Sequence, residues 1–205
     1  MRFIKHWKKV LLSTSIIALV FIIWDVIFTV NEVWGFNPDY YLGPKILSMP
    51  LEEWLFFFCI PYASIFIHYA LEHFAPETMF SRLLTKIIIG VVLIMCLGLV
   101  FFNNHKWYTV VNYSFLAIAM FLGWWYGISI LQRFFISFII ILIPFFIVNG
   151  ILTGTFIDAP VVWYNNQEIL GILLGTIPVE DIGYAFSMLF LNVLLFEKFK
   201  ENDTV

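Results

Sequence analysis

Long apolar stretches separated by short polar segments organise this chain. Six runs of about 20 residues carry few charges, and each is long enough to cross the hydrocarbon core of a bilayer as a helix. The runs cover residues 10–30, 51–73, 84–102, 107–129, 134–156 and 178–197. The pattern predicts an all-α integral membrane protein with about six transmembrane helices.

The composition leads to the same conclusion. Hydrophobic residues make up 62% and charged residues only 12% of the 205 positions, whereas soluble domains carry about 25% charged residues. Such a chain cannot cover a soluble globule with polar side chains, so we exclude a soluble protein. The run after Lys9 is too long for a signal peptide and has no small-residue cleavage site, so we expect it to be the first span.

The lysines and arginines predict the orientation of the spans. Lys45 and Lys106 lie in segments on one side of the predicted membrane. Nine lie on the other side, namely Arg2, Lys5, Lys8, Lys9, Arg82, Lys86, Arg133, Lys198 and Lys200. Because cytoplasmic segments carry the excess of basic residues, we expect a multi-pass protein of the cytoplasmic membrane with both termini in the cytoplasm. No basic patch indicates nucleic acid as a partner.

A ten-residue motif occurs twice. MPLEEWLFFF (49–58) recurs 128 residues later as IPVEDIGYAF (177–186). Pro50 matches Pro178, Glu52 matches Glu180 and Glu53 matches Asp181. Upstream, Gly43 and Gly171 each precede their proline by seven residues, and WDVIFT (24–29) resembles VNGILT (148–153) after a short gap.

The repeat therefore relates the first two spans and their loop to the last two spans and theirs. Four spans separate the copies, so we expect two parallel repeats with both acidic pairs at the same end of the bundle. For domain organisation, we divide the chain into a first unit at 1–105 (spans 1–3) and a second at 106–205 (spans 4–6). The apolar loop segments 40–49 and 169–177 are expected to be interfacial or re-entrant.

The acidic pairs allow two interpretations. A proline followed by carboxylates in the first turn is an ordinary way to begin a helix. The recurrence at one membrane side favours a functional role instead. Adjacent helical residues point about 100° apart, so we expect one carboxylate of each pair to face the loop backbone and the other to face inward. Two inward carboxylates in a dry site cannot both stay ionised, which gives a general acid beside a base.

Further side chains qualify as ligand contacts at this end. Aromatic ring faces stabilise cations, and six aromatic residues follow the acidic pairs: Trp54, Phe56, Phe57, Phe58, Tyr184 and Phe186. Asp25 and Asn149 occupy similar places in spans 1 and 5, where they would hydrogen-bond the acidic pairs or pack between helices. Tyr108, near a span end, is expected to anchor at the interface, like Trp7, Trp107, Trp124 and Trp125.

Several common site types have no signature here. The sequence contains no G-x-G-x-x-G motif, its four histidines are dispersed, and its five aspartates form no aspartate-rich box. Cys59 and Cys96 lie within apolar spans without ligand spacing. We therefore expect no cofactor and no metal.

The doubled P-x-E-E/D motif resembles the membrane-integral lycopene cyclases in their fused, two-repeat form. The W-D-x-x-x-T span and the W-G-F-N-P loop before the first copy add to the resemblance, which covers about residues 20–75 and 145–200. It implies cofactor-independent cyclisation of lycopene end groups to β-ionone rings without net redox, the reaction of an intramolecular lyase or isomerase. It also implies four catalytic residues, Glu52, Glu53, Glu180 and Asp181. Asp181 and Ala185 depart from the first copy, so the halves are expected to be inequivalent.

Two classes of function stay open beside this one. The first is a cyclase or hydratase of another carotenoid end group, because water can capture the same cation. The second is a non-catalytic carotenoid- or lipid-binding bundle, or a transporter, in which the acidic pairs cap helices. The expected partner is a carotenoid taken from the bilayer. Association into homo-oligomers or with other carotenoid enzymes is left open.

Overall fold

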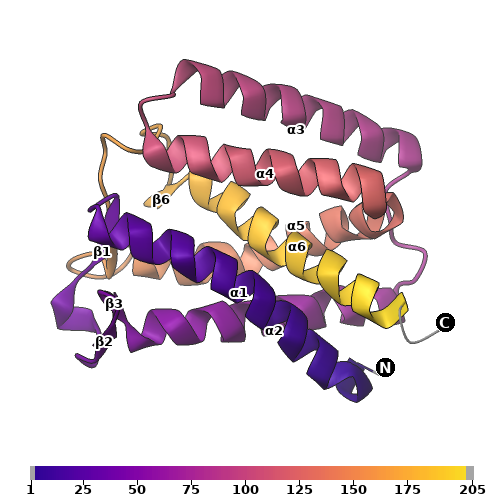
Figure 1. Ribbon diagram of the computed structural model, residues 1–205, viewed down its shortest axis with the longest axis horizontal. Coiled ribbons are helices and arrows are strands. Elements are labelled where there is room, and N and C mark those ends of the chain that lie inside the picture. Colours follow the sequence, from indigo (N-terminus) through magenta and orange to yellow (C-terminus); the bar gives the residue numbers. More distant parts are fainter. Residues whose placement is uncertain (1–2, 202–205) are drawn as a thin grey trace.

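The computed structural model describes residues 3–201 and contains six long helices (Figure 1). These are α1 (Trp7–Val30), α2 (Leu51–Phe74), α3 (Arg82–Phe102), α4 (Trp107–Tyr126), α5 (Ile128–Leu152) and α6 (Glu180–Glu201), with the short helix η1 (Phe3–His6) before α1. All six are long and apolar enough to cross a membrane, which confirms the all-α membrane fold. Arg2, which entered the charge distribution above, lies outside the described residues.

The fifth helix begins earlier than predicted. It starts at Ile128, directly after Gly127 ends α4, and not near residue 134. Gln132 and Arg133, which precede the predicted span, are helical and have partners at this end of the bundle. Gln132 Nε2 donates a 2.7 Å hydrogen bond to the Phe80 carbonyl, and Arg133 forms an ion pair with Glu72.

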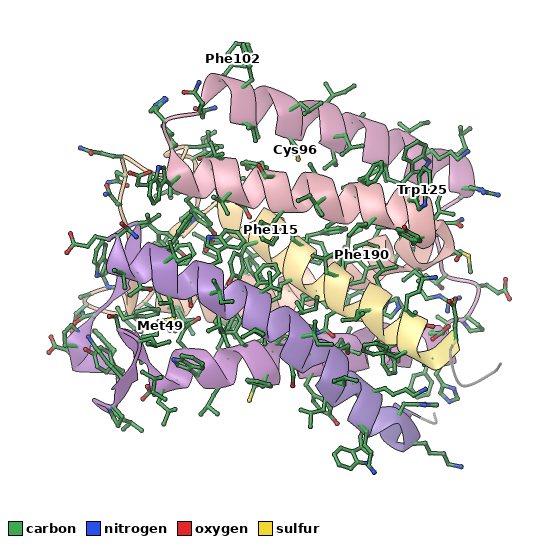
Figure 2. The ribbon with its side chains drawn as sticks, viewed as in Figure 1. Met49, Cys96, Phe102, Phe115, Trp125 and Phe190 are labelled. Carbon is green, nitrogen blue, oxygen red and sulfur yellow. The ribbon has the colours of Figure 1, made fainter. Side chains whose placement is uncertain are left out.

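The two ends of the bundle differ in character. In Figure 1, the start of α1 and the end of α6 lie at one end, and all the short strands lie at the other. Helix α6 runs through the middle, with 61% of its membrane-length window buried, whereas only 17% of that of α3 is buried. In Figure 2, Phe102 of α3 projects outward and Phe190 of α6 lies among the helices, in agreement with exposed fractions of 78% and 0%. The outer helix α3 therefore presents most of its surface to lipid.

The strand-bearing end shows the internal repeat directly. Strand β1 (Trp34–Phe36) pairs antiparallel with β4 (Val162–Tyr164), so that Gly35 lies opposite Trp163. The hairpin β2 (Lys45–Ile46)–β3 (Met49–Pro50) has its counterpart in β5 (Leu173–Leu174)–β6 (Ile177–Pro178), 128 residues later. Helix η2 (Pro38–Tyr40) lies between β1 and β2. Strands β1 and β4 are equivalent in the repeat and pair antiparallel. This arrangement indicates an approximate two-fold axis through the Gly35–Trp163 pair.

The loop segments before α2 and α6 share a glycine with positive φ at the equivalent position. Gly43 and Gly171 both have positive φ angles, +106° and +79°, which favour glycine. The segments expected to be interfacial or re-entrant are short hairpins with exposed apolar tips, including Leu47 and Leu173.

The ends of α1 and α5 change the register assigned to Asn149. Asn31 N–H donates to the Ile27 carbonyl, and Thr153 N–H donates to that of Asn149. These equivalent bonds are 122 residues apart and relate Asn149 to Ile27, whereas the sequence comparison had matched it to Asp25. The division of the chain at 105/106 stays a prediction.

Candidate active site

An apolar cavity with a volume of about 210 Å³ lies between α2, α5 and α6. It begins at the strand-bearing end and extends along α2 as far as Ile67. Three carboxyl groups line it, those of Asp25, Glu53 and Asp181. They come from α1, α2 and α6, so both copies of the acidic motif contribute to one cavity.

The other member of each acidic pair binds a loop. Glu52 Oε1 accepts a 2.8 Å hydrogen bond from the Leu42 N–H, and Glu180 Oε1 accepts one of 2.6 Å from the Leu170 N–H. The two bonds are equivalent, because each links residues ten positions apart in corresponding loops. Glu180 also accepts a 2.8 Å bond from the Thr109 hydroxyl. The prediction that one carboxylate of each pair faces the loop backbone and the other faces inward is confirmed.

Two tyrosine hydroxyls hold Asp181. Tyr108 donates a 2.5 Å hydrogen bond to Oδ1, and Tyr164 donates one of 2.8 Å to Oδ2. The two phenol rings stack with centroids 5.9 Å apart. Burial, together with the adjacent Asp181 charge, raises the pKa of Tyr164 well above its usual range. Tyr164 is therefore a neutral phenol that donates its proton in a hydrogen bond.

Tyr108 does not have the position predicted for it. Its side chain is only 1% exposed and points into the bundle, so it is not an interface anchor. The prediction was wrong because aromatic residues near a span end serve as anchors only where they face lipid. Here the first turn of α4 faces the second acidic pair.

Asp25 and Glu53 are the other two carboxylic residues of the cavity lining. The Asp25 side chain is buried, and its Oδ2 has no hydrogen-bond partner among the residues that the structure describes. The side chains of Asp25 and Glu53 line the same apolar cavity. Within residues 3–201 no side chain donates a hydrogen bond to Glu53. The two inward carboxylates, Glu53 and Asp181, thus occupy different environments.

The predicted aromatic contacts separate into two groups. Phe56 and Tyr184 line the cavity, and Asn149 lines it as well. Their assignment to substrate binding stays a prediction. The other four do not line it. Trp54 Nε1 donates to the Ile46 carbonyl, Phe57 is fully buried, Phe58 is exposed, and Phe186 packs among Phe134, Phe135, Phe138 and Phe190.

Sequence reasoning missed five aromatic residues of the cavity: Trp34, Phe36, Tyr108, Phe145 and Tyr164. The 128-residue repeat relates β1 to β4 and makes Tyr164 the counterpart of Phe36. An alignment through the loops would have paired these two residues, although it would not have placed them in the cavity. Tyr108 had no such signal, because α4 lies outside the repeated elements.

Two polar side chains on the C-terminal half of α2, His68 and Glu72, contact α5. His68 Nδ1 lies 2.8 Å from the Ser137 hydroxyl of α5, and Glu72 pairs with Arg133. Among residues 3–201, no group of three or more His, Cys, Asp or Glu side chains is arranged to hold a metal ion.

Comparison with known proteins identifies the family. The family model described as lycopene cyclase matches residues 2–74 and 105–199, which together form most of the chain. No curated protein and no solved structure matches the chain. The matched segments contain all three carboxyl groups of the cavity and the tyrosines that bind Asp181. The chain belongs to the lycopene cyclase family.

Proposed function

We propose that this protein is a lycopene cyclase that converts the acyclic end groups of lycopene into β-ionone rings by acid catalysis, without net redox. Family membership supports carotenoid cyclisation in general. The observation that carries the specific proposal is the apolar cavity where Glu53 and Asp181, one from each repeat, meet Asp25. An acid and a base in a water-poor pocket are the two groups that this reaction needs.

The proposed reaction conserves protons and electrons. A carboxylic acid gives its proton to the terminal double bond, which leaves a tertiary cation. The electron pair of a second double bond attacks that cation and forms the carbon–carbon bond that closes the six-membered ring. A carboxylate then removes a proton beside the new cationic carbon, and the ring alkene forms. One proton enters and one leaves, so the overall change is an isomerisation.

The cavity provides two kinds of stabilisation for the cation. Asp181 offers a negative charge, and the aromatic side chains of Trp34, Phe56 and Tyr184 offer ring faces. Fixed charges of this kind act more strongly in an apolar site than in water, because little solvent screens them. The apolar walls also limit capture of the cation by water, which would give an alcohol.

The substrate is proposed to reach the cavity from the bilayer. A linear C40 hydrocarbon dissolves only in the membrane interior, and the cavity lies between α2 and α5, two of the membrane-spanning helices. The remaining proposals concern location. They place the protein in the cell membrane with both termini in the cytoplasm and the cavity near the outer face.

The test is expression of the full chain in cells that accumulate lycopene, followed by chromatography of the extracted pigments. We expect cyclic carotenes from the natural sequence and unchanged lycopene from Glu53→Gln. Glu77→Gln, an exposed carboxylate at the opposite end of the bundle, is the matched control and should form product normally. Membrane levels of each variant are compared by immunodetection.

Two other outcomes would change the proposal. Unchanged lycopene with well-inserted natural protein would contradict the proposal. A hydroxylated end group would identify a hydratase in place of a cyclase.

A further inference from the structure

The two inward carboxylates differ in the partners that α4 provides. Asp181 receives two tyrosine hydrogen bonds, one to each oxygen, whereas its counterpart Glu53 lines the same cavity as Asp25 and receives no such bond among residues 3–201. Part of the difference arises from α4, which hydrogen-bonds the second acidic pair through Tyr108, Thr109 and Asn112. The rest comes from β4, where Tyr164 has a hydroxyl that its counterpart Phe36 in β1 lacks. The two loops are therefore related by the two-fold axis, but the hydrogen-bond partners of Glu53 and Asp181 are not.

We propose that Tyr108 and Tyr164 are positioning residues that keep Asp181 as an ionised carboxylate facing the substrate cation, while Glu53, together with Asp25, donates and recovers the proton. This inference rests on the proposed function and deepens it. It assigns different roles to two carboxylates that the repeat makes equivalent in sequence. It also gives roles to two tyrosines that the acidic motif does not contain.

The hydrogen-bond geometry supports the role given to Asp181. An ionised carboxylate only accepts hydrogen bonds, whereas a protonated one must use one oxygen as a donor. Both Asp181 oxygens accept from phenol groups, which favours the charged form and holds the side chain in one orientation. A charge held in this way is ready before the cation forms, and no solvent has to reorganise.

The position of Tyr108 is fixed by several bonds at the start of α4. The Trp107 N–H donates a 2.7 Å hydrogen bond to Glu168 Oε2, and the Tyr108 N–H donates one of 3.1 Å to the Glu168 carbonyl. Lys106 Nζ donates a 2.8 Å bond to the Ile169 carbonyl. These contacts tie α4 to the loop that leads into β5. These bonds hold the first turn of α4 in place, and with it the phenol group that donates to Asp181.

Asp25 and Glu53 fit the exchange of a single proton. Two carboxyl groups that line one apolar cavity disfavour a state with two negative charges, so we assign one shared proton to the pair. Glu53 releases this proton to the terminal double bond. After ring closure, the Asp25–Glu53 pair takes up the proton that leaves the ring. The pair is then ready for the next end group, and no proton has to cross the cavity.

The test compares rates of lycopene cyclisation by the full chain in liposomes of defined lycopene content. Six titratable residues line the cavity, namely Asp25, Glu53, Asp181, Tyr108, Tyr164 and Tyr184. Four of them are varied: Glu53, Asp181, Tyr108 and Tyr164. We expect Tyr108→Phe and Tyr164→Phe each to lower kcat about tenfold with KM unchanged, as for the loss of an interaction that acts in the transition state. Tyr113→Phe, a buried tyrosine of the same helix outside the cavity lining, is the matched control.

A mutant cycle separates positioning from folding. Asp181→Asn should retain slow, measurable cyclisation, lower by roughly 100-fold, whereas Glu53→Gln should form no product. In the Asp181→Asn background, removal of either hydroxyl should have almost no further effect, because the tyrosines act through the missing charge.

Three results would overturn the inference while leaving the cyclase proposal intact. These are complete loss of activity in Asp181→Asn, full activity in both tyrosine variants, and equal tyrosine effects with and without the Asp181 charge. No cyclic product from the natural chain would instead contradict the proposed function itself.

Discussion

Gly35 lies directly opposite Trp163 where the two loops of the repeat pair, and the indole ring fills the space that a side chain at Gly35 would need. A Cβ atom placed there would lie 2.3 Å from Cζ2 of Trp163. Because these residues form the central pair of β1 and β4, the contact fixes how closely the two halves approach above the cavity.

Gly35→Ala should destabilise the protein by about 1–3 kcal/mol, the usual effect of adding a carbon to a filled site. The thermal midpoint in detergent, followed by circular dichroism, measures the change. Gly90→Ala is the control, because a Cβ on this α3 residue meets nothing within 4 Å. Alanine there should be neutral or slightly stabilising. Equal midpoints for Gly35→Ala and the natural protein would contradict the steric argument.

Glu180→Ala should loosen the loop before β5. It removes the acceptor of the Leu170 N–H and of the Thr109 hydroxyl, and a buried group left without a partner costs about 1–3 kcal/mol. We expect hydrogen exchange at the Leu170 amide to accelerate at least tenfold. Glu180→Gln keeps an oxygen acceptor and should exchange close to the natural rate. A Leu170 amide equally protected in Glu180→Ala would show that the carboxylate does not hold the loop.

Ala63→Phe should block the cavity without unfolding the bundle. Ala63 lines the cavity on α2, and a phenyl ring there takes up space that a substrate end group needs. We expect cyclisation to fall by at least about tenfold, equivalent to about 1.4 kcal/mol. Ala70→Phe, on the same helix but outside the cavity lining, serves as the control. Comparable activity of the two variants would mean that substrate binds elsewhere.

Thiol labelling tests the proposed orientation. In a background with Cys59→Ser and Cys96→Ala, Leu47→Cys places a thiol on the β2–β3 hairpin, and Glu77→Cys places one between α2 and α3. Both native residues are exposed. A membrane-impermeant reagent should label Leu47→Cys in intact cells and Glu77→Cys only after permeabilisation. The reverse pattern would invert the orientation and place the cavity near the cytoplasmic face.

Most of the fold could be predicted from the sequence because a bilayer leaves few alternatives. Long apolar runs must form helices there, since every backbone polar group needs an internal partner. The predicted start of α5 came too late because the polar residues Gln132 and Arg133 fell outside the apolar run. Their polarity is accommodated within the helix by Phe80 and Glu72.

The site could be predicted only as far as the acidic motif reaches. The spacing of helical residues was enough to separate Glu52 and Glu180 from Glu53 and Asp181. Sequence could not show that Tyr108 meets Asp181, because that contact depends on how α4 packs against α6. It could not separate Phe56 from Phe57 and Phe58 either, since all three are equally apolar and only helix rotation decides which one faces the cavity.

Helices α3 and α4 stand outside the repeated elements, although topology does not require them. A unit of two spans returns the chain to the side on which it began, so a second copy could follow at once and point the same way. Here the inserted pair places Tyr108 and Thr109 on the second acidic motif. The segment that joins the two repeated units thus supplies hydrogen-bond donors to the second acidic pair. A symmetric dimer built from the α1–α2 unit alone would keep two inward carboxylates, but symmetry would give both the same environment.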